Sequence, residues 1–193
     1  MRLPVNEFGR WENSIGRRHF LKVGVLAAAA SMFPCPAFAS IRDFLSPFRT
    51  LALYNIHTGE SLDTVYWRHG KYVPEALVGI EHILRDHRTD EMTPIDTRLL
   101  DLLCAIGDRL DAREPFHIIS GYRSPSTNAL LCGQGAGVAK HSLHIYGKAA
   151  DISLPECELG LLRRVAMDLR AGGVGYYAKY SFVHVDVGRV RYW

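Results

Sequence analysis

The chain has 193 residues, of which 48% are apolar and 22% charged, and its formal net charge is +3. This composition indicates one compact globular domain and argues against a low-complexity or repeat protein. Five of the 23 basic and two of the 20 acidic residues lie within residues 1–39, so the remainder carries 18 of each. The positive excess therefore belongs to the N-terminal segment and gives no evidence of nucleic-acid binding.

The N-terminal segment, residues 1–39, has the order of a secretory signal. Arg17 and Arg18 precede an apolar stretch over 23–33, and the small-residue sequence "AFA" follows at 37–39. This pattern predicts a twin-arginine signal peptide that is cleaved after "AFA" and directs the protein to the periplasm or cell envelope. The apolar stretch is too short to cross a bilayer, so we expect no stable membrane span after cleavage.

The mature chain, residues 40–193, reads as one domain in which strands and helices are interleaved. Hydrophobic periodicity predicts, in chain order, a β-hairpin over 49–67 with its turn at 57–60, helices over 74–87 and 94–112, a strand over 116–120, a short helix within 121–131, a strand over 149–154, a helix over 157–170 stopped by Gly172 and Gly173, and a strand over 182–187. Asp96 is the expected N-cap of the second helix, and Ser124 or Ser126 that of the short one. We expect an α+β fold, with helices packed on a small, mainly antiparallel sheet.

Three cysteines remain in the mature chain once Cys35 leaves with the signal, namely Cys104, Cys132 and Cys157. An odd number permits at most one intramolecular disulfide. Their spacing does not suggest a zinc ribbon, so buried or singly paired cysteines are expected.

Two segments bring together residue types that bind metals. In "KHSLHIYGKAADISL", His144 and Asp151 flank Gly147, which allows a tight turn before a strand of small residues. In "FVHVD", His184 and Asp186 share one face of a strand, because strand side chains alternate with period two. Two histidines and one carboxylate match a catalytic zinc site, which keeps its fourth position for water. The remaining histidines are expected at the surface or in the core: His19, His57, His69, His82, His87 and His117.

Several motifs give the chain a family resemblance. "SLHIYGKAAD" fits the pattern S-x-H-x-x-G-x-A-x-D, "SGYRSPSTN" fits S-G-Y-R-S-x-x-x-N, and "FVHVDVGRVRYW" forms the end of the chain. Together with the hairpin sequence "LALYNIHTGESL", they resemble the zinc peptidases of the lysostaphin, D-alanyl-D-alanine and hedgehog type, and within these the YcbK-like murein endopeptidases. The resemblance covers nearly all of residues 47–193 and implies a hedgehog/D-Ala-D-Ala-peptidase-like fold.

The resemblance implies roles for individual residues. His144, Asp151 and His184 would be the ligands of a Zn²⁺ ion, which activates a water molecule for peptide hydrolysis. Arg123 matches the arginine that these enzymes place near the substrate, where it would stabilise the oxyanion or hold a substrate carboxylate.

The general base is the point at which the chain departs from its relatives. Some of them have a glutamate three residues before the last histidine ligand, a position occupied here by Ser181. Asp186 is the candidate that we assign to catalysis, because it shares a strand face with His184; it would equally serve to orient that histidine. His141 is the alternative base.

The function expected from this resemblance is zinc-dependent cleavage of the peptide cross-links between peptidoglycan stem peptides. A D-Ala-D-Ala carboxypeptidase and a non-catalytic, zinc-containing peptidoglycan-binding module are the alternatives. Tyr176, Tyr177 and Tyr180 would line the substrate groove or form a half-buried edge of the sheet. We expect a monomer whose partner is peptidoglycan.

Overall fold

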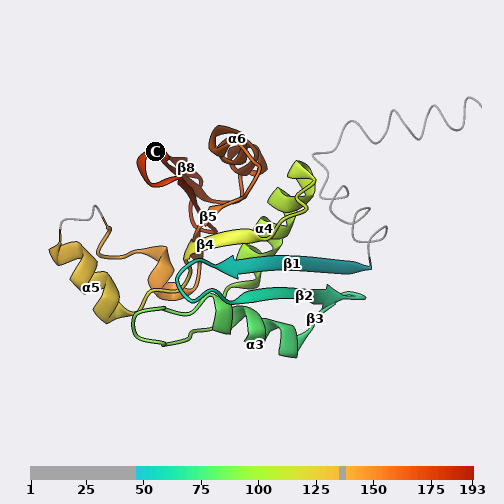
Figure 1. Cartoon of the computed structure of the whole chain (residues 1–193), viewed down its shortest axis with the longest axis horizontal. Coiled ribbons are helices and arrows are strands. Elements are labelled where there is room, and N and C mark those ends of the chain that lie inside the picture. Colours follow the sequence, from blue (N-terminus) through green and yellow to red (C-terminus); the bar gives the residue numbers. More distant parts are fainter. Residues whose placement is uncertain (1–46, 135–137) are drawn as a thin grey trace, which may run out of the picture. The chain divides into compact units, whose positions relative to one another are not determined.

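The computed structural model describes residues 47–134 and 138–193, which are built around one β-sheet (Figure 1). The predicted signal peptide, residues 1–39, lies outside the described residues. The elements follow in the order β1 (Phe48–Asn55), β2 (Ser61–Arg68), β3 (Lys71–Tyr72), α3 (Pro74–Ile83), α4 (Thr97–Leu110), β4 (Phe116–Ser120), α5 (Pro125–Gly133), the 3₁₀ helix η1 (Leu143–Tyr146), β5 (Ala149–Ser153), α6 (Leu159–Leu169), β6 (Gly173–Tyr177), the 3₁₀ helix η2 (Ala178–Tyr180), β7 (Phe182–Asp186) and β8 (Arg191–Tyr192).

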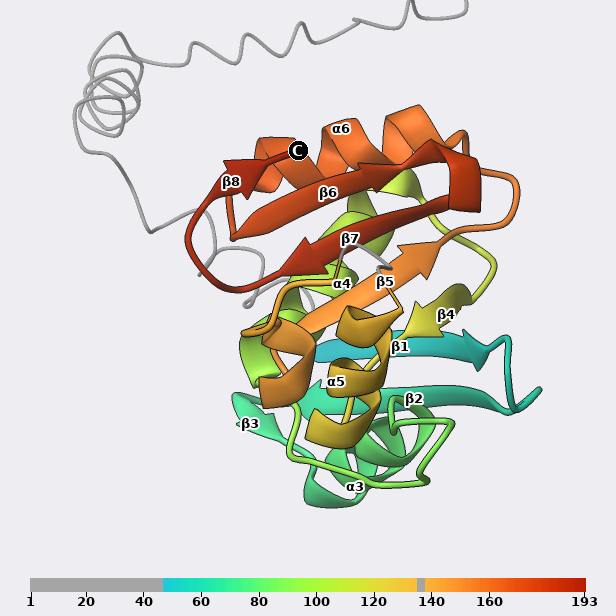
Figure 2. The same cartoon turned by 90° about the vertical axis from the view of Figure 1, so that its left-hand side faces the viewer.

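The sheet has eight strands in the order β3-β2-β1-β4-β5-β7-β6-β8. Five neighbouring pairs are antiparallel, whereas β1–β4 and β6–β8 are parallel. The predicted α+β class and mainly antiparallel pairing are confirmed, although the sheet is larger than expected because the short strands β3 and β8 extend its two edges. Helices α4 and α6 pack on each other behind the sheet, and α5 lies in front of it (Figure 2).

The local sequence signals are largely confirmed. Strands β1 and β2 form the predicted hairpin, with Tyr54 opposite Ser61 next to the turn. Asp96 caps α4 by accepting a hydrogen bond from the Arg98 amide, and Ser124 rather than Ser126 caps α5. Such caps are readable from sequence because they satisfy backbone N–H groups only a few residues away.

The hydrophobic core lies between the sheet and its helices. Strand β5 is buried from Ala149 to Ile152, as befits a central strand covered on both faces. Helix α4 turns one apolar stripe toward this core, with Leu99, Leu103 and Ile106 fully buried at helical spacing. The centre of the sheet is therefore a rigid platform for side chains at the ends of its strands.

The end of α6 differs from the prediction. The helix stops at Leu169 with Arg170 in the left-handed conformation (φ 51°), so Gly172 and Gly173 do not cap it. These glycines instead let the chain pass close to Asp186. A Cβ on Gly172 would overlap the Asp186 carbonyl oxygen, and one on Gly173 would overlap the Asp186 carboxylate.

We expect Gly172→Ala to destabilise the protein by about 3 kcal/mol or more, because the overlap is with backbone and two central segments must separate to relieve it. The free energy of unfolding in urea measures the effect. Gly133→Ala is the matched control, since a Cβ at this helical position meets nothing within 4 Å. Equal stabilities of the two variants would show that the approach of Gly172 to Asp186 is not rigid.

The segment that follows α3 is tied to the segment that begins α5. The Tyr122 amide donates to the Leu84 carbonyl at 2.7 Å, and buried Asp86 accepts from the Ser124 amide at 2.8 Å and the Arg88 amide at 3.0 Å. Burial raises the pKa of Asp86, but these hydrogen bonds and one from the Thr127 side chain outweigh burial and lower the pKa to about 2. Asp86 thus anchors the turn that carries Arg123.

This anchor makes stability depend on acid pH. Because the folded-state pKa of Asp86 lies below its unfolded value, its contribution is complete above about pH 4 and is lost as the pH falls toward 2. We expect Asp86→Ala to lower the free energy of unfolding by about 2 kcal/mol at pH 6 and by much less at pH 2.5. Urea titrations at both pH values measure it, with exposed Asp168→Ala as the control. A loss that is the same at both pH values would contradict the assignment.

Cys104, Cys132 and Cys157 are all free thiols. Within the described ranges, no helix combines the length and the apolar character that a membrane crossing requires.

Candidate metal centre

Three neighbouring elements carry the predicted metal ligands. His144 lies in η1, Asp151 in β5 and His184 in β7, and the antiparallel register of β5 and β7 places Asp151 directly opposite His184. Gly147 ends η1 with a φ of 63°, and a Cβ there would overlap the Pro94 carbonyl oxygen. A residue without a side chain is therefore needed for the chain to turn from His144 into β5.

The three side chains meet at one point. His144 Nε2 lies 3.1 Å from His184 Nδ1, which lies 2.9 Å from Asp151 Oδ1, and the third separation, from His144 Nε2 to Asp151 Oδ1, is 3.3 Å. All three residues are buried. Within the part of the chain that the structure describes, they form the one group of three or more histidine, cysteine or acidic side chains close enough to hold a metal ion.

The separations between these atoms fit a zinc ion. In a tetrahedral site with Zn–N and Zn–O bonds of about 2.0–2.2 Å, ligand atoms lie roughly 3.3–3.5 Å apart. The observed separations are equal to this or a few tenths of an ångström shorter. One carboxylate with two imidazoles is also a donor set that zinc accepts, and it leaves a fourth position for another ligand.

Neighbouring acceptors turn the correct nitrogen of each histidine toward this point. His144 Nδ1 donates to the Gly121 carbonyl oxygen at 2.7 Å, and His184 Nε2 donates to Asp186 Oδ2 at 3.1 Å. A neutral imidazole carries one proton, so the lone pairs of His144 Nε2 and His184 Nδ1 both face Asp151. The site is thus arranged for metal binding by groups outside the ligand set.

Asp186 lies on the far side of the His184 ring from the ligand nitrogen. Its side chain is fully buried, and its oxygens also accept from the Gly173 amide at 3.0 Å, the Gly188 amide at 2.8 Å and Arg191 at 2.8 and 3.2 Å. With these donors occupying it and an imidazole ring in between, the carboxylate does not reach the point where the ligands meet. Of the two roles considered for Asp186, this geometry is the one expected of a group that orients His184.

The electrostatics of the cluster favour positive charge at its centre. Burial raises the pKa of the Asp151 carboxyl, but His144 and His184 outweigh burial and hold this pKa below its ordinary value. Burial lowers the pKa of His184, yet hydrogen bonds to Asp151 and Asp186 raise it above its ordinary value. A divalent cation would supply the charge that these carboxylates stabilise.

The three side chains line a cavity of about 760 Å³. Its lining includes residues of the loop before η1 and aromatic residues near the C-terminus. Exposed His141, the alternative candidate for the base, also lines the cavity. Tyr177 and Tyr180 also line it, whereas the ring of Tyr176 lies under the Arg163 guanidinium, 5.1 Å away, so Tyr176 does not form part of the groove.

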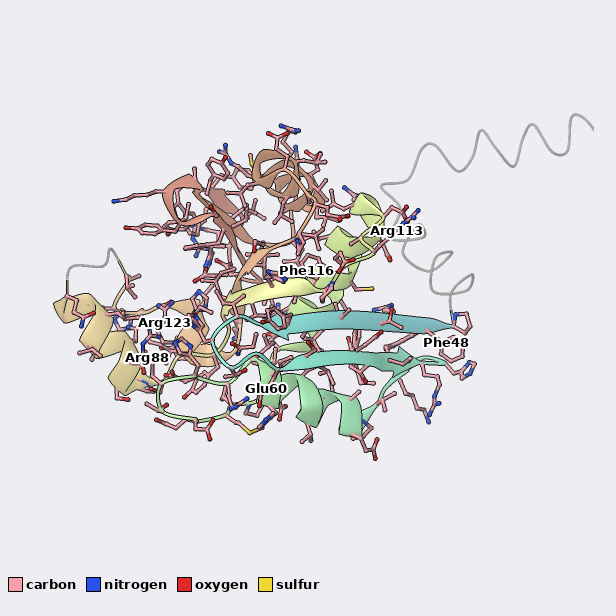
Figure 3. All side chains as sticks on the ribbon, in the orientation of Figure 1. Phe48, Glu60, Arg88, Arg113, Phe116 and Arg123 are labelled. Atoms are coloured by element: carbon pink, nitrogen blue, oxygen red, sulfur yellow. The ribbon has the colours of Figure 1, made fainter. Side chains whose placement is uncertain are left out.

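Arg123 reaches this cavity from the turn between β4 and α5, and Figure 3 shows it beside α5. It is buried, and its guanidinium lies 3.7 Å from Asp151 Oδ2 and at 3.3 and 3.4 Å from Ser120 Oγ and Asn128 Oδ1. These contacts are long for hydrogen bonds, so the guanidinium keeps the capacity to donate to a bound molecule. The side-chain amide of Asn128 in turn donates to the carbonyl oxygens of Ala139 and Lys140, and these hydrogen bonds hold the loop that carries His141.

Two residues of the site were not predicted from the sequence. Arg191 binds Asp186 with both of its terminal nitrogens, and the indole of Trp193 lies 5.3 Å from the His184 ring. The quoted sequence "FVHVDVGRVRYW" contains both, but no local signal distinguishes them from residues of an exposed edge strand.

The chain is similar to known proteins along most of its length. A family model described as "Peptidoglycan L,D-endopeptidase MepK" (Peptidase_M15_2) matches residues 45–193. The peptidoglycan L,D-endopeptidase MepK of Escherichia coli (strain K12) is 40% identical over 177 residues, which cover 92% of this chain and 96% of the relative. The probable peptidoglycan L,D-endopeptidase MepK of Haemophilus influenzae is 36% identical over 178 residues, with coverage of 92% and 95%.

Proposed function

The chain belongs to the family of peptidoglycan L,D-endopeptidases that includes MepK, and we propose that it hydrolyses, with a bound zinc ion, the peptide bond between an L and a D centre in peptidoglycan cross-links. Family membership makes it a peptidoglycan peptidase, as expected from the motifs, and its substrate lies in the cell envelope. Export by the twin-arginine route, cleavage after residue 39 and a monomeric state remain predictions.

One observation carries the zinc part of the proposal. His144 Nε2, Asp151 Oδ1 and His184 Nδ1 converge within 3.3 Å of one another, and all three residues line a cavity of about 760 Å³. Three protein ligands leave the coordination incomplete, which is the mark of a catalytic rather than a structural zinc site. When bound there, zinc would lower the pKa of a water molecule to about 7 and polarise the scissile carbonyl.

The surrounding residues have separable roles in this proposal. Gly121, through its carbonyl oxygen, and Asp186 hold the two histidine rings in the required tautomers. Arg123, with N–H groups still available, would bind the carbonyl oxygen as charge develops on it, or a carboxylate of the stem peptide. Of the described residues that line the cavity, His141 is the one histidine outside the ligand set, which supports it as the group that takes the proton from water and passes it to the leaving amine.

The test is mass spectrometry of cross-linked muropeptides incubated with the purified protein, with zinc and with a chelator. We expect cross-linked dimers to disappear with zinc, to persist with the chelator, and to disappear again when zinc is restored. Release of terminal D-alanine alone would identify a carboxypeptidase instead. Binding of muropeptides by the zinc-loaded protein without any product would identify a non-catalytic module.

A further inference from the structure

The last residue of the described chain extends into the cavity of the proposed metal site. Strand β8 pairs in parallel with β6, and the pairing continues through Trp193, whose amide donates to the Val174 carbonyl and whose carbonyl accepts from the Tyr176 amide. Figure 2 shows β8 and the C-terminus beside β6 at one edge of the sheet. The backbone of Trp193 is therefore held in the sheet, and its side chain lines the cavity.

The indole of Trp193 is fixed on several sides. Its Nε1 donates to the Tyr177 hydroxyl at 2.9 Å, and the Arg191 guanidinium lies 4.9 Å from its ring centroid. The ring also lies close against the backbone of Gly175, where an added Cβ would come within 2.6 Å of indole Cε2. Because Arg191 is itself bound to Asp186, the indole is connected to the same group that orients His184.

The position of the ring makes it a wall of the cavity. Its centroid lies 5.3 Å from that of the His184 ring, and Trp193 is nevertheless 46% exposed. A half-exposed aromatic ring that is held rigidly contributes contact area at little entropic cost. A peptide bond placed at the metal ligands would therefore pass beside a flat aromatic surface that is held by these contacts.

The stereochemistry of the substrate determines what such a wall accepts. In an extended peptide of L-residues, successive side chains point to opposite faces of the backbone. Inverting the configuration of one residue moves its side chain to the other face, so the two side chains that flank an L,D bond project to the same face. The opposite face then carries only hydrogen atoms and can lie flat on an aromatic ring.

We infer that Trp193 is a specificity-determining residue that selects an L,D over an L,L peptide bond by packing against the side-chain-free face of the substrate at the scissile bond. An L,L substrate in the same position directs one of its two side chains into the indole. The inference rests on the proposed function and adds to it a physical reason for the stereochemical preference.

The test uses two synthetic peptides of stem-peptide composition that differ only in whether the residue after the scissile bond is D or L. For the zinc-loaded full-length chain, selectivity is the ratio of kcat/KM for the L,D peptide to kcat/KM for the L,L peptide. We expect Trp193→Ala to lower this ratio at least about tenfold, with part of the change a faster cleavage of the L,L peptide. Trp193→Phe keeps a smaller flat ring, so its selectivity should lie between that of the wild type and that of Trp193→Ala. It also provides a test if the alanine variant folds poorly.

Trp67→Phe is the matched control, because Trp67 also lies under an arginine guanidinium, at 4.4 Å from Arg49, but sits on β2 and does not line the cavity. The selectivity of Trp67→Phe for the L,D over the L,L peptide should equal that of the wild type. If Trp193→Ala and Trp193→Phe cleave more slowly but keep the wild-type ratio, the inference is overturned while the proposed function stands. If the wild type cleaves neither peptide or shows no preference, the L,D assignment fails and the inference with it.

Discussion

His144→Ala should lose bound zinc and lower kcat/KM on cross-linked muropeptides by about a thousandfold or more. Zinc contributes several kcal/mol to the hydrolytic transition state, and each 1.36 kcal/mol is a factor of ten in rate. The variant removes one of three proposed ligands whose side-chain atoms lie within 3.3 Å of one another, and no other histidine, cysteine or acidic side chain of the described chain belongs to that group.

The loss of metal can be measured independently of activity. Zinc content by mass spectrometry and the melting temperature with and without chelator are the readouts, since a ligand that binds only the folded state raises its stability. Chelator should lower the melting temperature of the wild type and leave that of His144→Ala unchanged. His82→Ala, which alters an exposed histidine of α3, should behave as the wild type in zinc content, melting temperature and kcat/KM. Full zinc occupancy in His144→Ala would contradict the ligand assignment.

Asp186→Ala should weaken zinc binding and activity together, by about 10–100-fold, because it removes the acceptor that fixes the His184 tautomer. The change also leaves the Gly173 and Gly188 amides and Arg191 without an acceptor, so a loss of stability is expected. Arg191→Met is a milder variant that keeps the carboxylate but removes its guanidinium partner, and a smaller change in zinc affinity in the same direction is expected; it also removes the guanidinium beside the Trp193 ring. Competition with a chromogenic chelator measures the zinc affinity, and kcat at saturating zinc measures the activity of the loaded enzyme. Together they separate the effect on zinc binding from the effect on catalysis.

The same measurements decide which residue is the general base. His141→Gln should keep full zinc affinity and lower kcat by about 10²–10⁴-fold, the range of a lost proton acceptor. Asp186→Ala should instead recover part of its kcat when zinc is saturating. The assignment of these roles would be reversed if Asp186→Ala abolished turnover with zinc fully bound and His141→Gln had no effect.

Features that depend on a few consecutive residues were predictable from the sequence. The caps at Asp96 and Ser124 satisfy amides two or three residues away, and the hairpin turn lies between two β-rich segments. The common face of His184 and Asp186 follows from the two-residue period of a strand, and the 3.1 Å contact between them confirms it. In each case the chemistry that determines the structure lies within one element.

Features that depend on contacts between distant segments were not predictable in this way. Tyr176 and Tyr177 have the same residue type and adjacent positions, yet the strand period sends one ring toward Arg163 of α6 and the other toward the cavity. The glycines after α6 matched a helix stop signal, whereas close approach to Asp186 is what requires them. The sequence position of Asp186 was compatible with both of its candidate roles, and only the fold shows that its carboxylate is buried behind the His184 ring.

The sequence by itself determined the family, the α+β class and the candidate ligands, because a metal site needs particular residue types at spacings that a turn and a strand impose. The tertiary structure alone decided which nitrogen of each histidine faces Asp151, which carboxylate is enclosed, and that Arg191 and Trp193 join the site. Those decisions depend on the pairing of β5 with β7 and of β8 with β6, which brings together residues up to 40 positions apart. Hydrogen bonds and packing across such pairs are set by the folded sheet as a whole, so no stretch of the chain specifies them alone.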